Sequence, residues 1–400
     1  MAAGRKRPSK PKTARPWIIL VALALARIAF GYQFQSVASM GPDLIPLFHL
    51  SYAAFGQLIG AFMLAGVFVA LPLGALGRRF GDRWVLGAGL LLMTVGAVVS
   101  ASGDGPAGIA TGRTLAGVGA VAMIVLQGKI IADFFSGRRF MMAIGVSVCS
   151  YPIGVGMAQI ILPPVASHFG WQAGFLSGGV MTAIALVLFM ASYRAPVHAA
   201  EVPRHFAFPS RRECLLLGIA GTIWTAYTAG YAGYTSYIPQ ELHARGESLA
   251  LIGLVMTIGT WGNVPATLYG GDLAARFGGL NILLVGTASL AIGIVGTGLA
   301  GYPVAWSVLV GIVGSIHPGV IMAVGTLSAK PENRAVGMGL FYTVYYIGGT
   351  LGPMACGWAA DAYGGPPGGL LMSALLASLV VPLFLWHRAL AHHETMLVRP

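Results

Sequence analysis

Charged residues are scarce in this chain of 400 residues, and their scarcity excludes an ordinary water-soluble fold. Only 9% of the residues are Asp, Glu, Lys or Arg, whereas 56% are hydrophobic. A soluble domain carries about 25% charged residues, so this chain cannot cover itself with a water-facing surface. The composition therefore predicts a protein that lies in a membrane.

Several kinds of functional site are also missing from the sequence. The three cysteines, Cys149, Cys214 and Cys356, have no motif spacing, so we expect neither a disulfide framework nor a metal site. No Gly-x-x-x-x-Gly-Lys-Ser/Thr loop is present, which argues against ATP-driven pumping. No Ser-His-Asp arrangement can be recognised. We therefore expect no enzyme activity and no cofactor.

Positive charge is in excess, at a formal net charge of +12. This charge is spread over the stretches between apolar segments and forms no aromatic and basic face, so we expect no nucleic-acid partner. Its expected roles are to set membrane topology and to attract anionic lipid head groups.

Twelve apolar segments run through the chain, most of them close to the ~20 residues that cross a hydrocarbon core. They are predicted at 17–38, 52–73, 84–101, 107–128, 141–163, 171–192, 214–238, 249–269, 281–301, 304–327, 335–357 and 369–387. Only helices or closed barrels span lipid, because backbone polar groups must be satisfied internally, and segments of this length are helices. The predicted class is an all-α membrane protein with 12 transmembrane helices.

The basic residues predict an orientation for these helices. With the N-terminus in the cytoplasm, all but three of the 24 Lys and Arg residues fall on the cytoplasmic side. The exceptions are Arg245, predicted outside, and Arg27 and Arg113, predicted within the membrane. Cytoplasmic loops carry an excess of Lys and Arg, so we predict a multi-pass protein of the bacterial inner (plasma) membrane with both termini in the cytoplasm.

The longest polar interruption divides the twelve segments six and six. The predicted parts are a basic cytoplasmic tail at 1–16, an N-terminal six-helix bundle at 17–192, a cytoplasmic linker at 193–213, a C-terminal six-helix bundle at 214–388 and a cytoplasmic tail at 389–400. The halves also repeat, because the Gly74–Gly81 stretch after the second segment is echoed by Gly271–Gly278 after the eighth. Parallel six-helix repeats with a site between them are typical of one class of secondary transporters.

The loop after the second segment resembles a signature of the major facilitator superfamily, Gly-x-Leu-Ala-Asp-Arg-x-Gly-Arg-Arg. The matching residues are Gly74, Leu76, Arg79, Gly81 and Arg83. Arg78 stands where the family usually has Asp, and Asp82 stands where it usually has Arg. The resemblance implies a loop that braces the cytoplasmic gate, with Arg276 in the second copy, where Ala275 takes the place of the Asp.

Two further stretches resemble motifs of the same family. Arg113 to Ala120 in the fourth segment matches Arg-x-x-x-Gly-x-Gly-Ala, and Tyr151 to Gly156 partly resembles the exporter motif Gly-Pro-x-x-Gly-Gly. The stretch Gly31-Tyr32-Gln33-Phe34-Gln35-Ser36 and the loop at 77–82 resemble bacterial permeases grouped with cyanate and small-anion carriers. The resemblance implies two six-helix bundles that rock around a central site by alternating access.

No Asp or Glu falls within a predicted span, but two arginines do. Arg27 lies about 15 Å into the first segment, near the bilayer midplane. An Arg at that depth costs at least ~2.5–3.5 kcal/mol, so it should face the bundle interior or a wet cavity. We therefore predict an anion held by Arg27, with Arg113 as a second charge. The alternative is that each arginine is structural and bonds carbonyl groups left open beside glycines.

Uncharged polar residues supply the remaining candidates for substrate binding. Tyr227 and Tyr231 lie on one helical face of the seventh segment, and Tyr345 lies in the eleventh. These rings either line the cavity or pack helices together. Gln35 and Asn263 are single polar residues that either contact the substrate or join helices by hydrogen bonds.

His317 is the candidate for proton coupling. It precedes Pro318, which removes an amide donor and loosens the helix. A histidine in mid-span can take up a proton near working pH. The alternative is a neutral histidine bonded to a freed carbonyl.

Together these features predict a secondary active transporter of a small organic or inorganic anion. We expect transport to be driven by a proton or other coupling ion, or by exchange. We also expect the protein to work as a monomer among membrane lipids. A drug or metabolite exporter is the alternative within transport. A non-transporting membrane receptor or assembly factor on the same scaffold is the alternative of another class, and it would have a sealed cavity without convergent polar groups.

Overall fold

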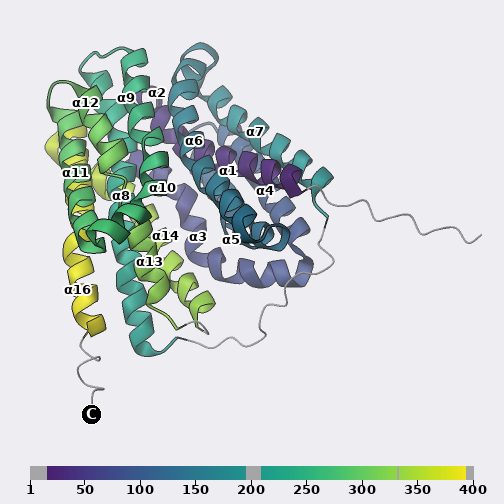
Figure 1. The fold of residues 1–400 in the computed structure, drawn as a ribbon. Helices are drawn as coiled ribbons and strands as arrows, with labels where there is room; N and C mark the ends of the chain where they lie inside the picture. The colour runs from purple at the N-terminus through teal and green to yellow at the C-terminus, as the bar shows by residue number, and fades with distance from the viewer. Residues whose placement is uncertain (1–15, 195–208, 331–332, 393–400) are drawn as a thin grey trace, which may run out of the picture.

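The structure is a computed structural model that describes residues 16–194, 209–330 and 333–392, of which 71–78, 141, 334–335 and 392 are described by their backbone alone. Every regular element in these ranges is helical (Figure 1). The prediction of an all-helical protein is therefore confirmed there. Both predicted tails lie largely or wholly outside the described residues, as does most of the predicted linker.

Among the described residues, the N-terminal half contains seven helices, and the C-terminal half contains nine α-helices and one π-helical segment. The first set is α1 (Pro16–Ser39), α2 (Gly41–Leu47), α3 (Tyr52–Phe80), α4 (Asp82–Ser102), α5 (Pro106–Phe134), α6 (Gly137–Phe169) and α7 (Trp171–Ser192). The second set is α8 (Arg211–Ala244), α9 (Leu249–Trp261), α10 (Asn263–Phe277), α11 (Gly279–Leu299), α12 (Pro303–Val308), η1 (Leu309–Val313), α13 (Pro318–Leu327), α14 (Arg334–Tyr363), α15 (Pro366–Ser378) and α16 (Val380–His392).

Ten helical stretches among the described residues are long and apolar enough to cross a membrane. The helices α8 and α14 cover the predicted seventh and eleventh segments. At 34 and 30 residues they are long enough to cross a membrane, but they are not apolar enough to be counted among these ten. Both are inner helices of the fold, since α8 contacts α14, α15 and α16, and α14 also contacts α3. Their lower apolar content fits helices that face other helices rather than lipid.

Three predicted spans are interrupted, which the apolar pattern alone does not show. The breaks fall between α9 and α10, between η1 and α13, and between α15 and α16. Each break lies about one turn before a proline, namely Pro265, Pro318 and Pro382. Proline has no amide hydrogen to bond the carbonyl one turn earlier, so the helix is weakest there.

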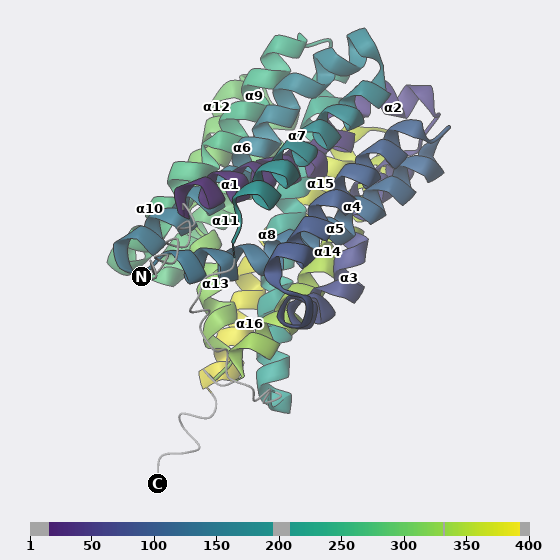
Figure 2. The same ribbon diagram turned by 90° about the vertical axis from the view of Figure 1, so that its right-hand side faces the viewer.

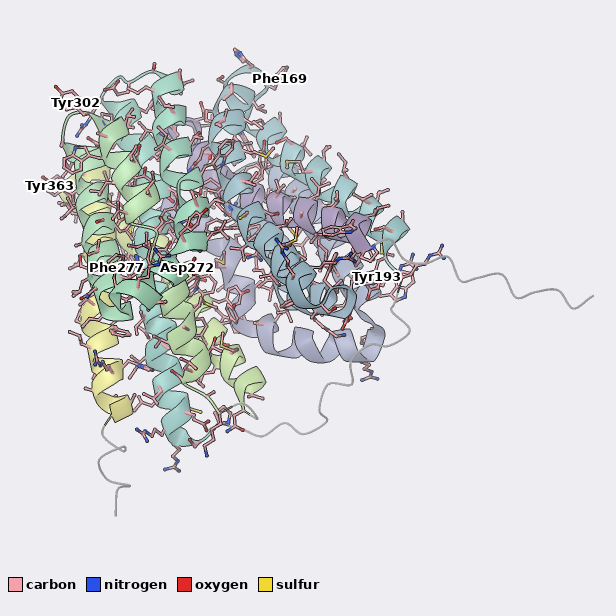
Figure 3. The ribbon with its side chains drawn as sticks, viewed as in Figure 1. Phe169, Tyr193, Asp272, Phe277, Tyr302 and Tyr363 are labelled. Carbon is pink, nitrogen blue, oxygen red and sulfur yellow. The ribbon has the colours of Figure 1, made fainter. Side chains whose placement is uncertain are left out.

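The two halves are inclined relative to each other. Figure 1 shows the helices of the C-terminal half nearly upright and those of the N-terminal half sloping away from them, and Figure 2 shows the two groups from the side. We refer to the end where α7 ends and α8 begins as the linker end, and to the opposite end as the α2 end. Exposed aromatic side chains such as Phe169 and Tyr302 project at the α2 end (Figure 3), as is common at a membrane–water interface.

Glycines bring helix backbones into direct contact within and between the halves. In α3, Gly56 faces the carbonyl of Pro353 and Gly60 faces that of Thr350, both in α14. In α6, Gly154 faces the carbonyl of Ile28 in α1. Small residues at such crossings let backbones approach closely, which is how helices gain packing energy in lipid.

We predict that Gly154→Ala destabilises the protein and that Gly145→Ala in the same helix does not. A methyl group at Gly154 would overlap the backbone of α1, whereas one at Gly145 meets no atom within 4 Å. Overpacking of this kind costs about 1–3 kcal/mol. Thermal unfolding of the purified variants measures the difference, and equal midpoints would contradict the assigned α1–α6 crossing.

Candidate functional site

A cavity of about 440 Å³ lies between the two halves. Its walls come from α1, α3, α5 and α6 on one side and from α8, α9, α10, α13 and α14 on the other. Among the described residues that line it, Arg27 is the one that carries a charge. Nine aromatic side chains also line it: Phe30, Phe34, Tyr151, Trp224, Tyr227, Tyr231, Tyr342, Tyr345 and Tyr346. The site is thus an apolar chamber of aromatic rings that contains a single cation.

Arg27 projects from the middle of α1 without an acidic partner among the described residues. Its guanidinium carbon lies 5.4 Å from the ring centre of Phe30 and 5.7 Å from that of Tyr151. Its Nε atom is buried and has no hydrogen-bond partner. Aromatic faces offset part of the cost of burying the charge, but the hydrogen-bonding capacity of the guanidinium remains unused. A carboxylate in the cavity would accept those hydrogen bonds in a two-point geometry.

The opposite wall carries a hydrogen-bonded polar group. Asn263 Nδ2 donates to the hydroxyl of Tyr227 at 3.3 Å, and the Thr267 hydroxyl donates to Asn263 Oδ1 at 2.8 Å. Tyr231 donates to the carbonyl of Gly259 at 3.1 Å, and its ring stacks on that of Tyr227 with 6.3 Å between centres. Because these groups already bond one another, the ring wall is held in place before any ligand binds.

Gln35 and Tyr345 also line the cavity. Gln35 is buried at the side nearer the α2 end, and its Nε2 atom donates to the carbonyl of Thr235 in α8 at 2.9 Å. Tyr345 lies between Trp224 and Tyr342, with ring centres 6.5 and 6.4 Å away. Six of the predicted substrate-binding residues therefore meet in one chamber: Arg27, Gln35, Tyr227, Tyr231, Asn263 and Tyr345.

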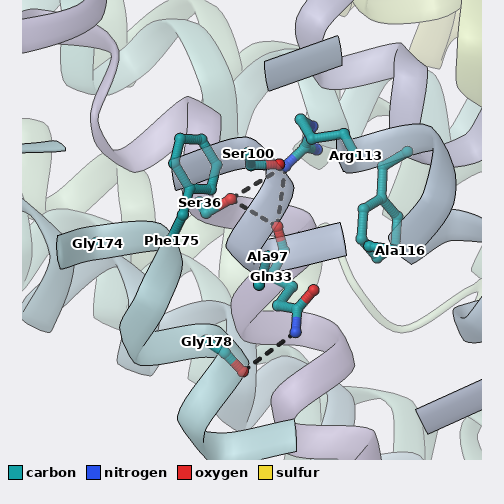
Figure 4. A pocket seen from close by; sticks show the side chains of 10 residues that line it. Gln33, Ser36, Ala97, Ser100, Arg113, Ala116, Gly174, Phe175 and Gly178 are labelled. Carbon is teal, nitrogen blue, oxygen red and sulfur yellow. Dashed lines mark hydrogen bonds between the residues drawn. The ribbon is translucent and has the colours of Figure 1, made fainter. Parts of the chain in front are cut away.

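Arg113 lies apart from this chamber, within the N-terminal half (Figure 4). Its Nε donates to the carbonyl of Leu58 at 2.6 Å, and its Nη2 donates to those of Phe34 and Ile59 at 3.1 and 3.2 Å. Its Nη1 donates to the carbonyl of Gln33 and to the hydroxyl of Ser36, both at 3.0 Å. The guanidinium thus ties α1 and α3 to α5. This geometry fits the alternative in which Arg113 is structural and bonds carbonyl groups, rather than a role as a second charge for a ligand.

His317 is also placed outside the cavity lining. It is completely buried at the start of α13, with its ring centre 4.9 Å from that of Tyr227. Neither ring nitrogen has a hydrogen-bond partner among the described residues. Because Tyr227 itself lines the cavity, a single aromatic ring separates this histidine from the chamber.

The predicted gating loop forms contacts within the N-terminal half. Asp82 accepts a hydrogen bond from Lys129 Nζ at 2.6 Å, and Arg83 Nη2 donates to the carbonyl of Met190 at 2.7 Å. Gly81 adopts a φ of 85° between α3 and α4, a conformation that favours glycine. The side chains of Arg78 and the surroundings of Gly74 lie outside the described residues. Arg79 lies over the ring of Phe80, and Arg276 is in the last turn of α10.

The aromatic rings nearest to Arg27 were not predicted as part of the site. Phe30 and Phe34 follow Arg27 at helical spacing, so they share its face of α1, and this signal was available. Tyr151 belongs to the stretch that partly resembles the exporter motif, and its ring flanks the guanidinium. Cys149 also lines the cavity, which no motif indicates.

We predict that Arg113→Lys lowers stability and leaves ligand binding unchanged. Lysine cannot supply the five hydrogen bonds that Arg113 makes to α1 and α3, and each unsatisfied buried carbonyl is costly. The expected loss is roughly 1–3 kcal/mol, measured by thermal unfolding without ligand. Loss of ligand binding in a variant of normal stability would restore Arg113 as a binding residue.

Curated relatives of this chain are transporters. It is 25% identical over 198 residues to a gallate transporter of Pseudomonas putida, covering 47% of this chain and 44% of the relative. It is 22% identical over 191 residues to the 4-hydroxybenzoate transporter PcaK of Pseudomonas aeruginosa, covering 48% and 42%. The matched region thus spans less than half the length of each of these relatives. The uncharacterised transporter YycB of Bacillus subtilis matches more fully, at 23% identity over 370 residues, with 88% and 89% of the two chains covered.

A solved structure of a bacterial homologue of the human lysosomal transporter Spinster, in an inward-facing and occupied conformation, has a similar fold. The TM-score is 0.74 at 17% sequence identity, and 96% of this chain and 98% of that chain are covered. The family model of the Major Facilitator Superfamily matches residues 23–353 and 215–398. With its all-helical architecture, its two halves and its membrane-crossing helices, this chain belongs to the major facilitator superfamily and is a multi-pass membrane transporter.

Proposed function

We propose that this protein is a secondary active transporter that moves a small organic anion across the bacterial inner membrane by alternating access. The observation that carries the proposal is the unpaired guanidinium of Arg27 in a ring-lined cavity between the halves. A cation without a partner in a low-dielectric site strongly attracts an anion, because little solvent screens the charge.

The proposed topology has twelve crossings, with α8 and α14 added to the ten apolar spans. The linker end then faces the cytoplasm, since the basic residues of loops such as that of Arg79 and Arg83 lie there. In this orientation the side-chain hydrogen bonds between described residues of the two halves all lie toward the periplasm. The cavity would be open to the cytoplasm, and the protein would be in its inward-facing state.

The cavity favours an organic anion over an inorganic one. An inorganic anion such as cyanate has almost no apolar surface to place against nine aromatic side chains. A carboxylic acid with a ring would bind Arg27 through its carboxylate and bury its ring among the tyrosines, and burial of apolar surface contributes about 25 cal/mol per Å². The names of the gallate and 4-hydroxybenzoate transporters support the same substrate class.

Proton coupling through His317 is proposed together with anion binding. His317 is fully buried, and neither of its ring nitrogens has a hydrogen-bond partner among the described residues. The imidazole can therefore take up a proton only if the surrounding site changes. Movement of Tyr227 when the cavity fills would provide that change, since the two rings are in contact. Exchange of one anion for another requires no such residue and remains the alternative mode.

The other candidate functions receive less support from the geometry. An exporter of lipophilic cations would place its substrate next to Arg27, where the like charge repels it. A receptor or assembly factor would have a sealed cavity without convergent polar groups, whereas this chamber is large and contains a cation. Both considerations favour transport of an anion.

We predict that benzoate raises the unfolding temperature of the purified protein and that Arg27→Gln abolishes this effect. A ligand that binds the folded state stabilises it in proportion to its occupancy. Loss of a hydrogen-bonded charge pair should weaken binding roughly 10- to 100-fold. Benzamide is the matched neutral ligand, and Arg27→Lys is the matched variant that keeps the charge. Equal stabilisation of wild type and Arg27→Gln by benzoate would exclude the proposed site.

We predict that His317→Gln separates coupling from binding. In proteoliposomes, an imposed proton gradient should no longer drive accumulation of the anion, because glutamine cannot carry the proton. Exchange of labelled for unlabelled anion should continue, since Gln keeps polar groups of similar size in the buried position. Proton-driven accumulation at the wild-type level in this variant would assign coupling to another group.

A further inference from the structure

The two halves are joined by hydrogen bonds near the α2 end of the molecule. Gln35 donates to the carbonyl of Thr235, and Gln240 Nε2 donates back to the carbonyl of Ala38 at 3.2 Å. Ala38 and Thr235 are separated by the same number of residues as Gly74 and Gly271. The two carbonyls that accept these hydrogen bonds therefore occupy equivalent positions in the internal repeat. A further bond runs from the Thr260 hydroxyl to Gln159 Oε1 at 2.9 Å. All of these groups are neutral.

Asp361 also joins the two halves. Among the side-chain hydrogen bonds that link described residues of one half to the other, those of Asp361 are the ones that involve a charged group. It lies near the end of α14, and its Oδ1 accepts the amide hydrogen of Tyr52 at 2.7 Å. Its Oδ2 accepts that of Ala53 at 2.9 Å. These are the first two amides of α3, which have no carbonyl partner inside their own helix. A carboxylate from the C-terminal half therefore caps a helix of the N-terminal half.

The cap is supported by the packing around it. The hydroxyl of Tyr237 donates to the carbonyls of Tyr52 and Pro353 at 3.3 and 3.1 Å. Gly357, one turn before Asp361, faces the backbone of Tyr52, so α14 can come close enough for the carboxylate to reach the amides. The equivalent helix in the other half, α9, is capped by Ser248, whose hydroxyl accepts from the amide of Leu251 at 3.2 Å. Ser51 caps α3 in the same way, through the amide of Ala54 at 3.1 Å. Asp361 is thus a second, charged cap that α3 has in addition to the serine cap that both helices share.

The position of Asp361 suits a contact that must form and break in each cycle. Its side chain is exposed, so water can solvate both the carboxylate and the freed amides when the halves part. A fully buried charge would lock the interface, because separating it from its partners is costly. An anionic cap at a helix N-terminus gains only a modest advantage from the helix dipole, which is enough to bias an equilibrium without fixing it.

We propose that Asp361 is the latch of the gate at the α2 end. It is a positioning residue that sets the balance between the state open at the linker end and the state open at the α2 end, and it does not touch the substrate. The proposal rests on alternating access as proposed above, but it is independent of which anion is carried. The neutral glutamine contacts close the same gate, and Asp361 supplies the charge that holds α3 against α14.

Cys149 provides the readout, because it lines the cavity and reports which side the cavity faces. In a Cys214→Ser, Cys356→Ser background, a membrane-impermeant maleimide is applied to intact spheroplasts and to inverted membrane vesicles. Asp361→Asn should raise the rate of Cys149 labelling from the spheroplast side and lower it from the vesicle side. The shift in the ratio of the two rates should be about two- to fivefold, the size expected for loss of one anionic cap at an exposed helix N-terminus.

Two matched variants separate a latch from a general effect of charge or stability. Asp361→Glu keeps the carboxylate and should restore much of the wild-type ratio. Glu241→Gln removes a charge at the same end that pairs with Arg245 inside the C-terminal half, at 2.7 Å, and should leave the ratio unchanged. An unchanged ratio in Asp361→Asn, or an equal shift in Glu241→Gln, would overturn the proposal. The benzoate shift in unfolding temperature, measured on the same variants, reports separately on the proposed substrate site.

Discussion

The cost of an unpaired charge inside a lipid bilayer is the constraint on which the rest of this structure depends. Two arginines lie in the spans, and the fold treats them in opposite ways. Arg113 donates five hydrogen bonds to α1 and α3 and holds the N-terminal half together. Arg27 receives only aromatic faces and leaves its guanidinium directed to a cavity. The same side chain therefore has its hydrogen bonds satisfied where backbone carbonyls surround it, and it keeps unused donors at Arg27, where no described residue accepts from it.

Helix packing places that cavity between the two halves. Glycines bring α1 against α6 within the N-terminal half and α3 against α14 across the halves, where the two backbones are in close contact. Prolines interrupt three spans of the C-terminal half, and two of those breaks lie beside the cavity at Asn263 and Pro318. Hydrogen bonds between the halves near the α2 end leave the chamber bounded there, as rocking about a central site requires.

Much of this arrangement could be predicted from the sequence, because lipid restricts a chain to few structures. Apolar length predicted the helices, and the depth of Arg27 in α1 predicted a cation that faces the interior. The division of the chain at 193–213 stays a prediction, since most of that stretch lies outside the described residues. The sequence could not distinguish Arg113 from Arg27, since the difference lies in which carbonyls surround each guanidinium after folding. The cap on α3 was equally hidden, because Tyr52 and Asp361 are 309 residues apart in sequence.

Protection of Cys149 by a ligand is the most direct test of anion binding at Arg27, because this thiol and Arg27 line the same cavity. In inverted membrane vesicles, benzoate and its neutral amide are compared for their ability to slow alkylation of Cys149. Benzoate should protect the thiol and benzamide should give little or no protection, since only the carboxylate can pair with Arg27. Equal protection by both compounds would show that the chamber binds rings without using its charge, and it would contradict the assignment of this protein as an anion carrier.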